Sequence, residues 1–323
     1  MPRNFLVTGG AGFIGSNFVR YVLENEPDAS VTNLDLLTYA GVKATVDELD
    51  RLPGHSFVLG DIRDADLVDR LTRDADVVVH FAAESHVDRS ITGPSVFLET
   101  NVVGTGVLLD AAARNRVPRF IHVSTDEVYG SVSEGFAGET ALLDPSSPYS
   151  ASKAGSDLIA LSYRITFDYP VIVTRCTNNY GPYQFPEKVV PLFVTNLLDG
   201  LEVPLYGTGS NERDWLYVGD HCSALHLLVD AGTPGEIYNI GANAQMTNID
   251  LTLRILEIMG KDESSIDYVE DRKGHDLRYA VDSSKIRSLG WEPAHPFDER
   301  LADTVAWYRS REDWWRPLKK AAP

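Results

Sequence analysis

A glycine-rich turn near the start of the chain constrains the fold more than any other feature. Gly9, Gly12 and Gly15 follow a short apolar run at residues 5–8, and the last of them lies in the first turn of a helical pattern over residues 13–23. Glycines at this spacing let a strand turn tightly into a helix and let a pyrophosphate approach the helix N-terminus. The turn therefore predicts a dinucleotide-binding strand–helix–strand unit.

An acidic residue at the end of the second apolar run indicates which dinucleotide is bound. Asp35 follows the run at residues 31–34 and lies twenty positions after Gly15. An acid at this place binds the hydroxyl groups of the adenosine ribose, and its charge would repel a 2′-phosphate. We therefore expect NAD rather than NADP.

The alternation of short apolar runs with helical patterns predicts an α/β fold. Further strands are expected at residues 57–61, 76–81, 119–124 and 171–175, and helices at 65–73, 96–115 and 150–167. This order predicts a Rossmann-type, doubly wound parallel sheet. After residue 178 prolines punctuate shorter elements, with helices expected near 191–198, 220–231 and 248–259. We expect an NAD-binding domain over 1–178 and a smaller mixed α/β substrate region over 179–323, with later segments returning to the sheet.

Charge and cysteine content exclude several classes of partner and site. The chain has 47 acidic against 29 Lys and Arg residues, a net charge of −18, which argues against nucleic acid or an anionic membrane as the main partner. Its only cysteines, Cys176 and Cys222, form no disulfide framework, so a reducing cytoplasm is expected. We see no signal-peptide pattern, no apolar run near the ~20 residues of a membrane span, and no histidine spacing of a metal site.

A tyrosine and a lysine four residues apart indicate redox chemistry. Tyr149 and Lys153 fall one helical turn apart and face the same way. The Lys153 ammonium and a cationic nicotinamide would favour the phenolate, moving a pKa of about 10 towards neutrality. Tyr149 could then deprotonate an alcohol while its carbon gives up hydride.

An acid pair adds a function that a simple dehydrogenase does not need. Thr125, Asp126 and Glu127 follow an expected strand, whose carboxyl end should lie at the ligand-binding edge of the sheet. After oxidation at C4 of a hexose, the C5 proton becomes acidic and the C6 hydroxyl becomes a leaving group. Glu127 could remove the proton while Asp126, with a raised pKa, protonates the C6 oxygen. Thr125 could bond the O4 oxygen.

Taken together, these motifs resemble a known family. The glycine spacing and the Tyr149/Lys153 pair resemble the extended short-chain dehydrogenase/reductase superfamily. The segments 82–90, 124–130, 178–183, 185–188, 213–215 and 271–276 occur in the order of the dTDP-glucose 4,6-dehydratase family, across nearly the whole chain. The resemblance implies an NAD-dependent hydro-lyase that recycles its cofactor, with a sugar-nucleotide-binding region after residue 178.

The resemblance also implies roles for individual residues. Besides the five catalytic candidates at 125–127, 149 and 153, it implies two sets of contacts. Cofactor contacts are expected at Gly9, Gly12, Phe13, Ile14, Gly15, Asp35, Leu36, Thr38, Asp61, Ile62, Phe81, Ala82, Ala83, Ser85, Thr100, Tyr149, Lys153 and Asn178. Substrate contacts are expected at Ser85, Thr125, Asn179, Lys188, Val189, Pro204, Tyr206, Arg213, Asn248, Arg272, His275 and Tyr279.

Three alternatives remain at this point. A sugar-nucleotide 4-epimerase shares NAD and the Tyr149/Lys153 pair but has no need of Asp126 and Glu127. A 4,6-dehydratase of another nucleotide sugar needs the same groups, and a non-catalytic NAD-binding sensor needs none of the catalytic ones. The resemblance further implies a homodimer through a four-helix interface, formed by about 96–115 and 150–167 of each subunit.

Overall fold

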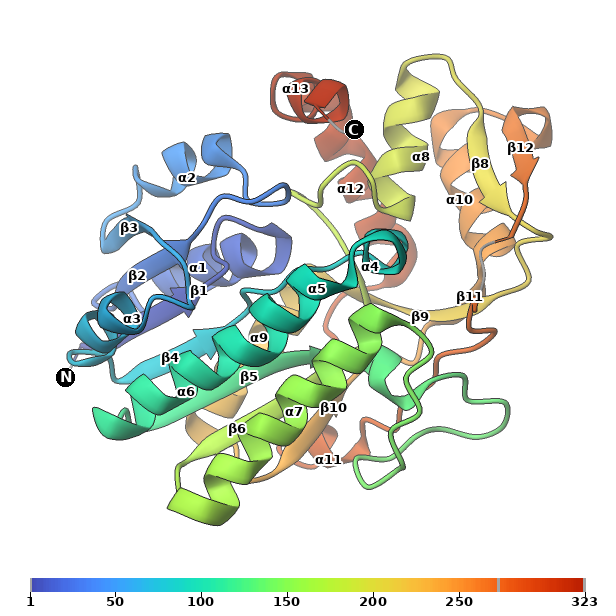
Figure 1. The fold of residues 1–323 in the computed structure, drawn as a ribbon. Coiled ribbons are helices and arrows are strands. Elements are labelled where there is room, and N and C mark those ends of the chain that lie inside the picture. Colours follow the sequence, from blue (N-terminus) through green and yellow to red (C-terminus); the bar gives the residue numbers. More distant parts are fainter. Residues whose placement is uncertain (1, 272–273, 322–323) are drawn as a thin grey trace.

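The apolar runs of the chain pair into one seven-stranded sheet in which every pairing is parallel (Figure 1). The computed structural model describes residues 2–271 and 274–321. The strand order is β10-β6-β5-β4-β1-β2-β3, which confirms the expected Rossmann-type fold. The strands are β1 (Asn4–Thr8), β2 (Ser30–Asp35), β3 (His55–Leu59), β4 (Val77–His80), β5 (Arg119–Thr125), β6 (Val171–Cys176) and β10 (Ile237–Ile240).

Helices cover both faces of this sheet because its strands are apolar on both sides. One apolar core lies against α1 (Phe13–Asn25), α2 (Lys43–Leu49), α9 (Val218–Ala231) and the short α11 (Ser284–Arg287). The other lies against α3 (Ala65–Thr72), α6 (Thr105–Arg114) and α7 (Pro148–Phe167). In Figure 1, α6 and α7 lie side by side across the sheet.

The helix expected at 96–115 is built from three consecutive segments. After α4 (Val87–Thr92) come α5 (Pro94–Phe97), the π-helical η1 (Leu98–Gly104) and then α6. Contrary to the sequence expectation, the combined stretch Pro94–Arg114 is long and apolar enough to span a membrane, although core helices of globular proteins meet the same criterion. Here η1 packs against α7, and Thr100 lines a cleft described below.

The second half of the chain forms a smaller region with its own core. Two short sheets, β11-β9-β7 and β12-β8, pack with four helices around this core. Trp307 and Trp314, which lie on the last two helices of the chain, pack together in this core with ring centroids 5.2 Å apart. These elements are β7 (Asn178–Tyr180), α8 (Val189–Leu198), β8 (Val203–Tyr206), β9 (Glu212–Tyr217), β11 (Gln245–Thr247), α10 (Asn248–Met259), β12 (Ile266–Val269), α12 (Phe297–Ser310) and α13 (Glu312–Ala321).

Candidate active site

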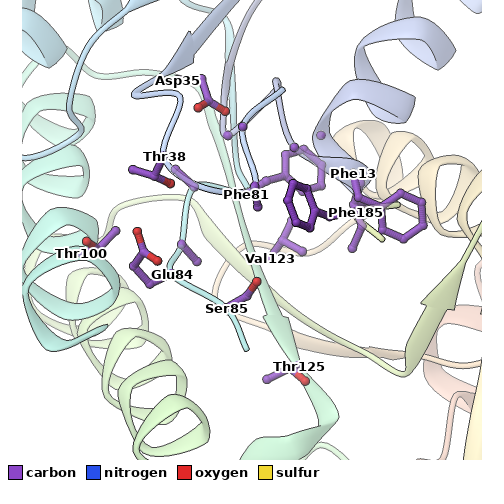
Figure 2. Close-up of a pocket in the computed structure, with 18 of the residues that line it drawn as sticks. Phe13, Asp35, Thr38, Phe81, Glu84, Ser85, Thr100, Val123, Thr125 and Phe185 are labelled. Carbon is purple, nitrogen blue, oxygen red and sulfur yellow. The ribbon is translucent and has the colours of Figure 1, made fainter. Parts of the chain in front are cut away.

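A cleft runs along the carboxyl ends of the parallel strands, where open α/β sheets bind ligands. All eighteen residues that the sequence assigned to the cofactor line it. Figure 2 shows Asp35 and Thr38 towards one end and Thr125 at the other, with Phe13, Phe81 and Phe185 along one side. The cleft therefore gathers residues from both halves of the chain, because Asn178, Phe185 and Lys188 also line it.

The glycine turn forms a cradle that side chains would fill. Gly9 has φ +76°, and a Cβ there would lie 2.5 Å from the Ala82 nitrogen. A Cβ on Gly15 would lie 2.3 Å from the carbonyl oxygen of Gly9. No side chain in the described part of the chain caps the N-terminus of α1. Its N-terminal amide groups therefore suit a pyrophosphate.

Asp35 ends β2 with its carboxylate held by the loops around it. Oδ2 accepts a hydrogen bond from the Ala11 nitrogen at 3.0 Å, and Oδ1 accepts one from the Leu37 nitrogen at 2.8 Å. Burial raises the pKa of this carboxyl, while the two backbone donors oppose the rise. The position suits ribose hydroxyls, and together with the glycine cradle it fits NAD.

Tyr149 and Lys153 lie on one face of the first turns of α7 and both line the cleft. A capping box between Ser147 and Ser150 fixes the start of this helix. Lys153 is buried, and its Nζ donates to the carbonyl oxygen of Val123 on β5 at 2.8 Å. The ammonium is thereby anchored to the strand that leads to the acid pair.

In the chain taken alone, the Tyr149 pKa is shifted in the opposite direction to the one expected with a cationic nicotinamide bound. Burial raises the pKa of this phenol well above its ordinary value, and the nearby Glu127, Cys176 and Asp126 act in the same direction. Any shift towards neutrality must therefore come from the positive charge of a nicotinamide in the cleft.

The acid pair begins a short 3-10 helix, η2 (Asp126–Tyr129), directly after β5. Thr125 caps it: its Oγ1 accepts from the Glu127 nitrogen and donates to Asp126 Oδ1, both at 3.2 Å. Asp126 is 3% exposed, and its Oδ2 has no hydrogen-bond partner among the described residues. Burial, and then the charge of Glu127, raise the pKa of Asp126 well above its usual range, as the sequence predicted.

The residues assigned to the substrate divide into two groups. Ser85, Thr125, Asn179 and Lys188 line the cleft itself. Asn179 is held in place, because its Nδ2 donates to the Thr177 carbonyl at 2.9 Å and its Oδ1 lies 3.0 Å from His221 Nδ1. These four residues therefore share the cleft with the expected cofactor contacts, whereas Asp126 and Glu127, directly after Thr125, are not among the residues that line it.

A second group lies outside the residues that line the cleft. Arg213 is buried against Tyr279, with its guanidinium 4.2 Å from the ring centroid, and its Nη2 donates to the Asp276 carbonyl at 2.9 Å. Tyr206 contacts His275 edge to face at 6.1 Å. Val189, Pro204 and Asn248 lie on α8, β8 and α10. Arg272 lies outside the described residues.

Arg213 and Tyr279 are nevertheless electrostatically coupled to the acid pair. The charge of Arg213 opposes the rise in the Asp126 pKa. Burial, followed by the charge of Glu127, raises the pKa of Tyr279.

Within residues 2–271 and 274–321 no three His, Cys, Asp or Glu side chains are grouped to hold a metal ion.

Comparisons with known proteins agree with this site. The family model described as GDP-mannose 4,6 dehydratase matches residues 6–304. The dTDP-glucose 4,6-dehydratase of Streptomyces antibioticus is 57% identical over 323 residues, covering 98% of this chain and 96% of the relative. The chain belongs to the dTDP-glucose 4,6-dehydratase family.

Solved structures place this family member within its superfamily. DesIV, a dTDP-glucose 4,6-dehydratase from Streptomyces venezuelae solved with NAD and TYD bound, matches with a TM-score of 0.95 and 55% identity. It covers 98% of this chain and 99% of that chain. A UDP-glucose 4-epimerase from Thermotoga maritima matches with a TM-score of 0.88, 32% identity, and coverage of 95% and 99%. The fold is thus shared by dehydratases and epimerases, so the site must distinguish the two reactions.

Sequence reasoning missed a group of residues that closes this family member's cleft. The Tyr39 hydroxyl donates to the Ser85 carbonyl, and the Arg89 guanidinium lies 3.9 Å from the Tyr39 ring centroid. Arg89 Nη2 also lies 3.3 Å from Glu187 Oε2. These contacts join three loops that are far apart in sequence. Arg89 and Glu187 stood inside motifs that we recognised, but only tertiary contacts reveal their pairing.

Asn101 is a second missed residue. It lies on the π-helical turn of η1, is 1% exposed, and its Oδ1 accepts from the Glu84 nitrogen at 2.8 Å. Its Nδ2 donates to the Glu84 carbonyl and to Ser152 Oγ. In this dehydratase family member, Asn101 thereby connects the loop that contains Glu84, which lines the cleft, to α7. In the sequence, an asparagine within an apolar helical pattern is the signal that could have identified Asn101.

Proposed function

We propose that the chain is an NAD-dependent hydro-lyase that converts dTDP-glucose to dTDP-4-keto-6-deoxyglucose. The observation that carries this proposal is the acid pair Asp126–Glu127, placed after Thr125 at the end of the cleft that Tyr149 and Lys153 line. An epimerase only oxidises and reduces C4, so it has no use for two further carboxyl groups. The similarity to dehydratases at more than half of all positions supports the same assignment.

The first step is oxidation at C4. Tyr149 takes the proton of the C4 hydroxyl, while Lys153 positions the cofactor and Thr125 Oγ1 bonds the O4 oxygen. A bound NAD would supply the hydride acceptor for C4 and the hydride donor for C6. The glycine cradle and Asp35 would hold the dinucleotide, and the contacts among Tyr39, Arg89 and Glu187 would favour its retention between turnovers.

The second step is loss of water across C5 and C6. Glu127 removes the C5 proton, which the C4 ketone has made acidic, and Asp126 protonates the C6 oxygen as the C6–O bond breaks. Asp126 suits this role because burial and the charge of Glu127 raise its pKa well above the usual range. Glu127 then returns a proton to C5, and proton transfer from Tyr149 or solvent restores Asp126.

The substrate's diphosphate needs local cations, since the chain is strongly acidic. Lys188 lines the cleft and Arg213 lies near the acid pair, while Arg272 is assigned by the motif alone. We keep all three as proposed diphosphate contacts.

We further infer that the chain works as a homodimer in the reducing cytoplasm. Both cysteines are free and buried. The helices η1 and α7 carry several exposed apolar side chains, namely Leu98, Val103, Leu158, Ile165 and Phe167. A second copy seated on these helices would cover them and complete a four-helix interface.

The first test is incubation with dTDP-glucose in deuterated water, without added NAD, followed by mass spectrometry and NMR of the product. We expect a 4-keto-6-deoxy sugar with deuterium at C5. Tyr149→Phe should slow oxidation about a hundredfold or more. Glu127→Gln should instead spare oxidation and slow exchange at C5 by a similar factor.

Three outcomes would contradict the proposal. A dTDP-galactose product would identify a 4-epimerase, and full turnover by Glu127→Gln would remove the role given to that carboxylate. Conversion of UDP- or GDP-glucose, but not of dTDP-glucose, would assign the chemistry to another nucleotide sugar.

A further inference from the structure

A buried ion pair lies directly behind the redox residues and takes no part in the steps above. Asp157 on α7 is fully buried, and its Oδ2 accepts from Arg175 Nε on β6 at 2.9 Å. Arg175 is itself 2% exposed. Moving two charges out of water costs about as much as their attraction returns, so such a pair adds little to stability. Its presence therefore calls for another explanation.

On one side, this ion pair adjoins the redox residues. Tyr149, Lys153 and Asp157 follow one another at four-residue spacing, so they form one stripe along α7. Asp157 favours the charged form of Lys153, against the effect of burial. Its Oδ1 lies 3.4 Å from Nε2 of the buried His122 on β5. Asp157 is thus fixed relative to the strands beneath the cleft.

On the other side, the ion pair reaches the elimination residues. Arg175 Nη1 donates to the Tyr129 hydroxyl at 2.8 Å, and the guanidinium lies 4.8 Å from the Tyr129 ring centroid. Tyr129 is the last residue of η2, the 3-10 turn that begins with Asp126. Its hydroxyl donates in turn to Asn239 Oδ1 on β10 at 2.8 Å. The turn that carries the acid pair is therefore anchored through Tyr129 to Arg175.

We propose that Asp157, Arg175 and Tyr129 are positioning residues that hold the acid pair of η2 in register with the Tyr149/Lys153 pair of α7. The inference rests on the proposed function, which needs both pairs to act on adjacent carbons of one sugar. Figure 1 shows α7 crossing β5 and β6, so the Asp157–Arg175 bond spans the layer between helix and sheet. An error of about 1 Å in such an arrangement costs about a hundredfold in rate.

The test compares Tyr→Phe substitutions at two buried tyrosines, each of which removes only a hydroxyl group. Tyr129→Phe removes the hydroxyl that Arg175 holds, whereas the control Tyr169→Phe removes a hydroxyl with no hydrogen-bond partner among the described residues. Both tyrosines are 5% exposed, so the two changes disturb packing to a similar extent. Single-turnover build-up of reduced nicotinamide measures oxidation, and deuterium entry at C5 measures elimination.

We expect Tyr129→Phe to oxidise dTDP-glucose within about threefold of wild type and to eliminate water at least about tenfold more slowly, because only the acid pair loses its anchor. Reduced nicotinamide should then accumulate. Tyr169→Phe should match wild type in both steps. Asp157→Asn is the second variant: since Asp157 also adjoins Lys153, we expect it to slow oxidation as well as elimination.

Equal elimination rates in Tyr129→Phe and Tyr169→Phe would overturn the inference and leave the proposed function standing. The inference also fails, with the proposed function intact, if Tyr129→Phe slows both steps equally or if Asp157→Asn leaves both unchanged. If wild type performs neither step, the proposed function fails and the inference fails with it.

Discussion

At the residue scale, the most informative group is Asp126, a buried carboxyl whose pKa is raised by its surroundings. Burial and the neighbouring Glu127 raise its pKa, and one of its oxygens has no partner in the described part of the chain. A buried carboxylate in this position would be unstable, whereas a carboxylic acid can donate its proton to a leaving hydroxyl. The raised pKa of Asp126 therefore suits it to the acid role in the proposed elimination.

Asp126 should make stability depend on pH in a defined direction. The folded chain keeps its proton above the ordinary carboxyl pKa of about 3.9, where the unfolded chain loses it. The free energy of unfolding therefore falls as the pH rises from about 4 towards the raised pKa. Asp126→Asn removes the titrating group and with it this fall in unfolding free energy. Between pH about 4 and the raised pKa, the variant's unfolding free energy, measured with urea, should therefore increase relative to that of wild type. A stability difference that does not change with pH would contradict the assignment.

Asp35 should set cofactor choice. Asp35→Asn keeps the size of the side chain but removes the charge that accepts hydrogen bonds and repels a 2′-phosphate. A hydrogen bond to a charged group is worth about 1.5–3 kcal/mol, so NAD affinity should fall about tenfold or more. The ratio of the NADP dissociation constant to the NAD dissociation constant should decrease. Calorimetry after removal of the cofactor measures the two dissociation constants, with the exposed Asp28→Asn as control.

At the element scale, the turn from β1 into α1 leaves no room for a side chain at Gly15. A Cβ there would meet the Gly9 carbonyl oxygen at 2.3 Å, so Gly15→Ala must displace the backbone that cradles the cofactor. We expect a loss of about 1–3 kcal/mol in unfolding free energy, together with loss of bound NAD. A Cβ at Gly138 would meet no described atom within 4 Å, so Gly138→Ala should retain both. Equal behaviour of the two variants would refute the prediction.

The same scale shows how far the sequence could predict the fold. The six strands of the N-terminal half were expected to within two or three residues, because short apolar runs between glycines and helical patterns have few other interpretations. The π-helical turn at η1 was not predicted, since its extra residue per turn leaves no mark in hydrophobic spacing. No strand after residue 176 was predicted, so β7, β8, β9, β10, β11 and β12 were all missed. Five of these six strands have only three or four residues, too few to show a periodicity.

Local motifs predicted the lining of the cleft, but the contacts that hold it together depend on tertiary structure. The eighteen cofactor candidates stand in recognisable motifs and all line the cleft. The pairing of Arg89 with Glu187, and that of Asp157 with Arg175, joins residues from separate elements. Only the packing of the chain brings such partners together.

At the scale of the whole molecule, the exposed apolar face of η1 and α7 predicts association. Ile165 is 84% exposed and lies seven residues from Leu158 on the same face of α7. A charge buried in an apolar interface is costly, so Ile165→Glu should weaken the dimer at least about tenfold. Light scattering after gel filtration over a concentration series measures this. Leu142→Glu, at a position that is 90% exposed on a separate loop, should leave the dimer intact. A monomeric wild type would refute the proposal.

The strand β10 has a consequence for how this enzyme class can diversify. It comes from the second half of the chain, yet it forms the edge of the main sheet beside β6, and its Asn239 bonds Tyr129. The chain is therefore interleaved, and a cut after residue 178 would remove a strand from the sheet. Exchanging the C-terminal half as a block would therefore also exchange a strand of the cofactor-binding sheet. Chimeric enzymes with crossovers in the loops on either side of β10 would leave this strand with its original sheet.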